Sequence, residues 1–167
     1  MKSPAYILIT LILLLIIFLS FPSLAQESQR TQDNSEIYPQ QIGTQNVTLL
    51  SESSWKGINN SSYHQLGSQQ EILLQQYGSN NETLLIQGGA NNQMDITERG
   101  NDITAIIRQS GSDNQAHVEL TSDFSSIRIV QSGNGHELIS TDYSNTPQNY
   151  EVKQAGMVGM TVIIRRY

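Results

Sequence analysis

Amide side chains that recur at a nearly constant spacing carry the clearest chemistry of this chain. A carboxamide both donates and accepts hydrogen bonds, so identical amides stacked above one another can bond in a continuous ladder. Such a ladder satisfies buried polar groups and couples one layer of a protein to the next. Six glutamines recur at intervals of 22 to 24 residues, each opening a Gln-x-Gly triplet: Gln41, Gln65, Gln87, Gln109, Gln131 and Gln154.

Two further sets of residues follow the same spacing. We expect the glycines of the triplets to allow backbone angles that a Cβ would forbid: Gly43, Gly67, Gly89, Gly111, Gly133 and Gly156. We expect a second ladder from the amides five positions after a Gln-x-Gly glutamine: Asn46, Gln70, Asn81, Asn92 and Asn114. A fixed period of about 20 to 50 residues indicates stacked structural units. The repeat therefore favours a stacking protein over an enzyme with a pocket.

Each repeat of about 22 residues contains two similar halves in which apolar and polar residues alternate. In one half, Asn81, Thr83, Leu85 and Gln87 are two apart, so they share one face of a strand. Short polar segments with glycine separate the halves, which predicts strand–turn–strand–turn. No 3.6-residue pattern follows residue 25, so we expect no helix there.

The simplest structure for this pattern is an all-β fold, a β-solenoid with one repeat per turn and cross-β stacking. Strands of successive turns would lie about 4.8 Å apart, and either handedness is compatible with the sequence. We expect about five and a half turns, with repeats near 41–64, 65–86, 87–108, 109–130 and 131–153 and a partial unit at 154–167.

Acidic residues interrupt the column that opens the second half of each repeat, which runs Glu52, Gln76, Glu98, Leu120 and Asp142. Because acids are rarely fully buried, we expect Glu52, Glu98 and Asp142 to lie at strand corners in contact with water. The alternative is that they point inward, which would raise their pKa values and make assembly faster in mild acid.

The first 40 residues differ from the repeats. Residues 1–25 combine Lys2, an apolar run and a small-residue end at Ala25, which predicts a secretory signal peptide; a membrane anchor is the alternative. Residues 26–40 are polar and aperiodic, which predicts a flexible leader. The chain contains no cysteine, and its net charge of −6 argues against binding to nucleic acid.

The repeat resembles that of the curlin family. The motif Gln-x-Gly-x-x-Asn, followed by alternating apolar residues, stands here at residues 76–87 and again at 109–118. Five copies in phase, a predicted signal peptide and a polar leader match curlin architecture over the whole chain. The resemblance implies a non-enzymatic subunit of extracellular amyloid fibres on a Gram-negative bacterium, which supports adhesion and biofilm. It also implies no cofactor, and export through an outer-membrane pore that recognises the leader.

Curlins comprise a major subunit that builds the fibre and a minor subunit that nucleates it. This chain is more similar to the minor one, because its repeats are irregular and aliphatic and its C-terminus is basic and apolar. The implied partners are a major subunit, further copies of the chain and accessory surface factors. The alternatives are a major fibre-forming subunit, or a secreted β-helix protein that binds or degrades polysaccharide. In the last two repeats His136 and Gly159 replace asparagine, which puts the docking of these turns in question.

Both ends of a solenoid leave strands unpaired, and such edges are templates for another chain. Natural soluble solenoids cover them with polar caps, and no cap is recognisable here. The end of the last unit has two interpretations. Arg165, Arg166 and Tyr167 could attach the protein to an anionic surface, or the charges could restrain aggregation of the strand before them.

Other chemical signals in the sequence are weak. The three histidines lack ligand spacing, and the alternation directs His117 outward and His136 inward, so we expect no metal site. No Gly-x-Ser-x-Gly motif marks a nucleophile. Trp55 lies in a two-residue insertion, where we expect it to anchor a loop.

Overall fold

The computed structural model describes residues 36–53 and 57–167. The predicted signal peptide, most of the predicted leader, and Trp55 lie outside these residues. The described part of the chain is built from strands and turns and contains no helix, hence none that could cross a membrane. The strands are β1 (Glu36–Thr44), β2 (Val47–Ser53), β3 (Asn60–Ser68), β4 (Glu71–Tyr77), β5 (Glu82–Ala90), β6 (Gln93–Arg99), β7 (Thr104–Ser112), β8 (Gln115–Leu120), β9 (Ser126–Asn134), β10 (Glu137–Asp142), β11 (Asn149–Gly156) and β12 (Thr161–Arg166).

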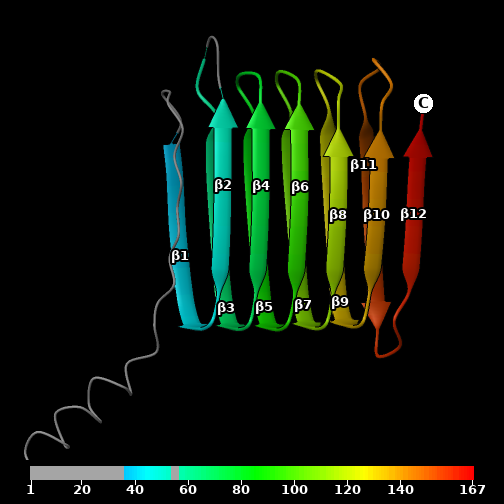
Figure 1. Cartoon of the computed structure of the whole chain (residues 1–167). Coiled ribbons are helices and arrows are strands. Elements are labelled where there is room, and N and C mark those ends of the chain that lie inside the picture. The colour runs from blue at the N-terminus through cyan, green and yellow to red at the C-terminus, as the bar shows by residue number, and fades with distance from the viewer. Residues whose placement is uncertain (1–35, 54–56) are drawn as a thin grey trace, which may run out of the picture.

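Successive strands alternate between two parallel six-stranded sheets, so that each pair of strands makes one turn of a β-solenoid. Sheet A has the order β1-β3-β5-β7-β9-β11, and sheet B has the order β2-β4-β6-β8-β10-β12. Figure 1 shows the two sheets face to face, with β1 and β2 at one end and β11 and β12 at the other. The predicted all-β solenoid with two strands per turn is therefore confirmed.

The solenoid has six turns, where five and a half were expected. Residues 36–40 belong to β1, which pairs with β3 from Glu36↔Asn60 to Thr44↔Ser68, so the predicted leader is partly a strand. At the other end Thr161–Arg166 pairs with β10 and completes a sixth turn with β11. The repeat glutamines stand inside strands of sheet A and do not mark where a turn begins. The 22-residue period does not predict at which residue each turn begins.

The alternation along each strand places every second side chain, mostly aliphatic or amide, between the two sheets. In β7 the buried residues are Ala105, Ile107 and Gln109, and the neighbours between them face outward. Burial of aliphatic side chains stabilises this core at about 25 cal/mol per Å² of apolar surface. The core contains Leu50, Tyr63, Ile72, Leu74, Leu85, Met94, Ile96, Ile103, Ala105, Ile107, Ala116, Val118, Leu120, Ile127, Ile129 and Leu138.

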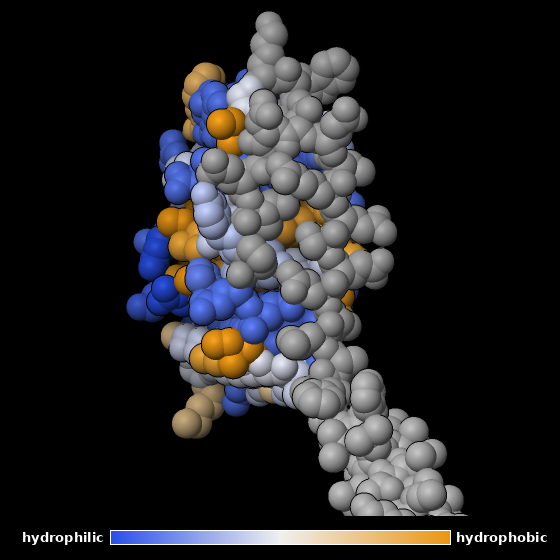
Figure 2. Space-filling view, turned by 90° about the vertical axis from the view of Figure 1, so that its left-hand side faces the viewer, coloured by the Kyte–Doolittle hydropathy of each residue, from blue (hydrophilic) through white to orange (hydrophobic). Residues whose placement is uncertain are grey.

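The outer faces of the sheets carry mixed side chains. Figure 2 shows hydrophilic and hydrophobic residues intermixed on the face that it presents. Cross-strand pairs join some of the charges, as between Arg99 and Glu119 at 2.7 Å and between Arg128 and Glu151. Because both partners of the second pair are half-exposed, this contact adds little to stability. The polar side chains that stack between the two sheets say more about function than these surface ion pairs do.

Candidate functional site

The six repeat glutamines form one column inside sheet A. Each side-chain nitrogen donates to the carbonyl oxygen of the glutamine one turn further on, at distances between 2.5 and 3.0 Å. From Gln65 onward, the same nitrogen also donates to a backbone carbonyl near the start of a sheet B strand, for example from Gln109 to Gln93 at 2.9 Å. Both amide protons are therefore used, and the column joins successive turns as well as the two sheets.

This column has a direction. In all five bonds between these glutamines the nitrogen of one donates to the oxygen of the next toward the C-terminal end. Gln154 is the last of them, and its nitrogen turns instead to the carbonyl oxygen of Met160 at 2.6 Å. Both protons of the Gln154 amide are therefore used within the chain, by the carbonyls of Glu137 and Met160. The ladder can continue beyond Gln154 only if this nitrogen exchanges the Met160 carbonyl for the side-chain oxygen of a further glutamine.

A second column lines the turn that leads from sheet A into sheet B. It contains four of the predicted amides and one histidine: Asn46, Gln70, Asn92, Asn114 and His136. Asn114 shows the pattern, because its backbone N–H donates to Asn92 Oδ1 at 3.2 Å and its side-chain nitrogen donates to the Gly133 carbonyl at 2.9 Å. The column satisfies backbone groups where the chain leaves one sheet for the other.

Asn81 was wrongly assigned to this ladder. It lies in the opposite turn, which leads from sheet B into sheet A. Its backbone N–H donates to Asn59 Oδ1 at 3.1 Å, and its own Oδ1 accepts from the backbone N–H of Ile103 at 3.0 Å. The two halves of a repeat look alike in sequence but enter different sheets, so residues eleven positions apart, such as Asn81 and Asn92, fall into separate columns.

His136 preserves the second column where the sequence departs from asparagine. Its backbone N–H donates to Asn114 Oδ1 at 3.1 Å, and its Nε2 lies 3.2 Å from the Gly156 carbonyl. The Asn114 side-chain nitrogen makes the equivalent contact with the Gly133 carbonyl one turn earlier. His136 Nδ1 accepts from the backbone N–H of Met160 at 3.3 Å, so the proton resides on Nε2. The histidine therefore docks the last turn instead of disrupting it.

The predicted turn glycines form a column at the ends of the sheet A strands. Gly89 has φ +111°, and a Cβ on it would meet the Gly111 carbonyl oxygen at 1.9 Å. Neither the backbone angle nor the neighbouring turn would accept a side chain at this position. Its neighbour Gly88 has open space around the same hypothetical atom. The close approach of one turn to the next thus requires glycine at position 89 but not at position 88.

The three acids expected in water are buried. Glu52, Glu98 and Asp142 occupy inner positions at the ends of sheet B strands, with exposures of 4%, 0% and 3%. Each stands two residues beyond another inward side chain, as Glu98 does after Ile96, so the alternation continues to the end of the strand. The expectation of strand corners in contact with water is wrong because the strands extend through these positions.

Glu98 shows how such a carboxyl is accommodated. It accepts from the Gln76 amide at 2.8 Å and, across the core, from the Thr83 hydroxyl at 3.0 Å. Burial raises the pKa of Glu98 from 4.5 to about 7, with Glu52 adding to the rise, while the bonds from Gln76 and Thr83 oppose it. The carboxyl is therefore substantially protonated near neutral pH. The alternation predicts that Thr83 faces inward, but nothing in the sequence indicates that it would contact Glu98.

The other two acids each keep one carboxylate oxygen without a hydrogen bond within the described chain. Glu52 accepts from the Ser61 hydroxyl through Oε1 at 2.6 Å, and its Oε2 has no partner. Asp142 accepts from the Ser144 backbone through Oδ1 at 2.8 Å, and its Oδ2 has none. A buried acceptor without a partner is costly, so these two oxygens mark places where a donor would stabilise the structure.

The C-terminal turn has free sheet edges. Within the described residues, β11 pairs only with β9, and β12 pairs only with β10. Val152 and Ile164, which continue the apolar columns of the core, are only half-buried there. Arg165 and Arg166 are exposed, and the ring of Tyr167 lies 6.4 Å from that of Tyr143.

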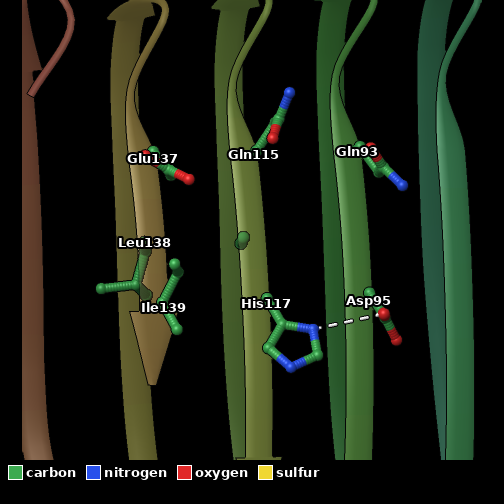
Figure 3. Close-up of a pocket in the computed structure, with 8 residues that line it drawn as sticks. Gln93, Asp95, Gln115, His117, Glu137, Leu138 and Ile139 are labelled. Atoms are coloured by element: carbon green, nitrogen blue, oxygen red, sulfur yellow. Dashed lines mark hydrogen bonds and ion pairs between the residues drawn. The ribbon is translucent and has the colours of Figure 1, made fainter. Parts of the chain in front are cut away.

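A shallow pocket on the outside of sheet B carries polar side chains. Figure 3 shows the His117 ring directed toward Asp95 on the neighbouring strand, and the two atoms that face each other are 3.2 Å apart. Glu137 and two glutamines complete the polar lining. His117 faces outward and His136 inward, as predicted. Within residues 36–53 and 57–167 no group of three metal-binding side chains converges.

Comparison with protein-family models, curated proteins and solved structures found no match to this chain.

Proposed function

We propose that this chain is a curlin-like minor subunit, which nucleates the polymerisation of a major subunit into extracellular amyloid fibres at the surface of a Gram-negative bacterium. The observation that supports this function most is the uncovered C-terminal turn, where two parallel sheets end without a further strand in the described chain. Edges of this kind recruit strands from other chains. Adhesion and biofilm formation follow as consequences of the fibre.

The backbone at this edge is ready to accept a strand. Glu137 N–H donates to the Met160 carbonyl and Tyr143 N–H to the Arg166 carbonyl, so even-numbered residues of β12 bond to β10. In a parallel ladder the residues between them direct their N–H and C=O groups to the other side. Thr161, Ile163 and Arg165 thus present backbone groups to an incoming strand.

Templating is the step that such an edge accelerates. A disordered chain must lose conformational entropy before its contacts form, and this makes spontaneous nucleation slow. A folded turn with aligned backbone groups and an amide ladder removes much of that cost for the first added turn. The irregular inner column of acids, together with the basic C-terminus, favours the minor subunit over the major one.

The proposal is tested by adding fibres of the purified protein to a regular, slowly polymerising curlin subunit and following thioflavin fluorescence. We expect the lag to disappear and the product to give cross-β diffraction at about 4.7 and 10 Å. A chain that stays dispersed, or fibres that leave the lag unchanged, would contradict the proposed function.

An edge variant makes this test specific. Ile163→Pro removes a backbone N–H directed away from β10, so it should block strand addition while the contacts to β10 remain. Ile163→Ala keeps this N–H and serves as the matched control, because the side chain is half-exposed. We expect seeding to be lost with proline and retained with alanine. Equal seeding by both would show that the β12 edge is not the template.

A further inference from the structure

The inner column of acids ends in a basic residue. Register pairing places Asp142 beside Arg166, and the same column runs back through Leu120, Glu98 and Gln76 to Glu52. Glu52 is therefore the first member of the column and Arg166 the last. Arg166 does not bond to Asp142; its guanidinium donates to the Thr146 hydroxyl at 2.5 Å, outside the core.

The two unsatisfied carboxylate oxygens lie near the ends of this column. Asp142 Oδ2 stands one turn before the C-terminal end, and Glu52 Oε2 stands in the first turn. Both acids are buried, so each oxygen lacks both water and a hydrogen-bond donor from the described chain. A guanidinium offers five N–H donors in a planar fork and can serve two carboxylates at once.

A second copy stacked on the C-terminal turn would bring these groups together. If the sheets continue in register, Gln41 of the second copy follows Gln154, and Glu52 of the second copy follows Arg166. Strands in a sheet are about 4.8 Å apart, so Arg166 would lie one strand spacing from Asp142 on one side and from the second copy's Glu52 on the other. The apolar column would continue from Ile164 to Leu50.

The direction of the glutamine ladder selects this orientation. At the C-terminal end the Gln154 nitrogen can exchange the Met160 carbonyl for the side-chain oxygen of Gln41 of a second copy, so the ladder continues in the same direction where a C-terminal end meets an N-terminal end. Two C-terminal ends face to face would bring donor against donor. Head-to-tail contact is therefore the arrangement in which the amide ladder and the charge pairing both continue.

We propose that Arg166 turns inward when copies of this chain stack, and forms a buried ion pair with Asp142 of its own chain and Glu52 of the next copy. This inference rests on the proposed function, since it concerns the same C-terminal edge, and it identifies the partner as a second copy of this chain.

The decisive experiment measures how fast monomers with altered charges add to fibre seeds of the same variant. Arg166→Gln removes the positive charge and leaves two buried carboxylates without a counter-ion, so we expect the elongation rate to fall by about tenfold or more. Arg165→Gln is the matched control, because its side chain is exposed on the outer face and removes the same charge. Its elongation rate should stay within about twofold of the original rate.

A compensating variant separates pairing from a general effect on the strand. The triple change Glu52→Gln, Asp142→Asn and Arg166→Gln replaces the charged column ends by amides, so no buried charge remains. We expect it to restore elongation to the level of the Arg165→Gln control. Equal rates for the two single variants, or a slow triple variant, would overturn the ion pair while seeding by the original chain continues. If the original chain formed no fibres, the proposed function would fail as well.

Discussion

The hydroxyl of Thr83 in sheet A donates to both carboxylate oxygens of Glu98 in sheet B, at 3.0 Å each. This contact joins the two sheets near one end of their strands, and both side chains are buried there without access to water. The pair explains how an acid can occupy an inner position of a solenoid, and it makes the protonation of one side chain part of the stability of the fold.

Stability and assembly should therefore depend on pH. Because the folded-state pKa of Glu98 is raised from 4.5 to about 7, the folded state holds this proton more tightly than the unfolded chain does. The stabilisation is fully present below pH 4.5 and is lost as the pH rises through about 7. It amounts to on the order of 3 kcal/mol, at roughly 1.4 kcal/mol per pH unit. We expect faster assembly at pH 5 than at pH 8.

Glu98→Gln is the control for this pH effect. It keeps the size and hydrogen-bonding capacity of the side chain without the titration, so its assembly rate should vary much less between pH 5 and pH 8. A rate that is flat across this range in the original protein would refute the role of Glu98. An unchanged slope in the variant would assign the effect to another group.

Adjacent glycines provide a test of the close approach between turns. Gly89→Ala would place a Cβ against the Gly111 carbonyl oxygen, at a backbone angle that alanine rarely adopts. We expect the folded turn to lose about 2 kcal/mol or more. Gly88→Ala has open space and should be neutral or stabilising by up to about 1 kcal/mol. Denaturant midpoints of the two variants measure the difference, and equal midpoints would contradict the close contact.

The glutamine ladder can be tested in its centre. Gln109→Ala removes a donor to Gln131 and an acceptor for Gln87, and it leaves the Gln93 carbonyl without its side-chain donor. We expect a loss of about 2 kcal/mol or more and slower assembly. Gln115→Ala, on the exposed outer face, should change stability by less than about 0.5 kcal/mol. Similar losses in both variants would mean that the ladder contributes little.

His136 is predicted to hold the last turn in place. His136→Leu removes the side-chain contacts to the Gly156 carbonyl and the Met160 N–H, so amides of β12 should exchange with solvent much faster. His136→Asn can restore the first of these contacts, as Asn114 does one turn earlier, and should retain most of the protection. Hydrogen exchange of Val162 and Ile164 reports this directly. Unchanged protection in the leucine variant would exclude the role.

The period and alternation of the sequence were sufficient to predict two strands per turn and which residues face inward, such as Leu85 and Ile107. A side chain in a strand has only two directions, so a binary pattern determines its face. The same pattern placed Gln41, Gln65 and their equivalents in register, because a nearly constant spacing aligns equivalent residues of stacked turns. Export, the leader's role and the fibre itself stay predictions.

The tertiary structure decided the features that depend on where the chain reverses direction. Glu98 is buried because β6 continues past Ile96 to Arg99, and no local signal marks the end of a strand within a polar segment. Asn81 belongs to another column than Asn92 because successive half-repeats enter different sheets. The juxtaposition of Asp142 with Arg166 likewise exists only once a sixth turn has formed, since residues 24 apart become neighbours through stacking alone.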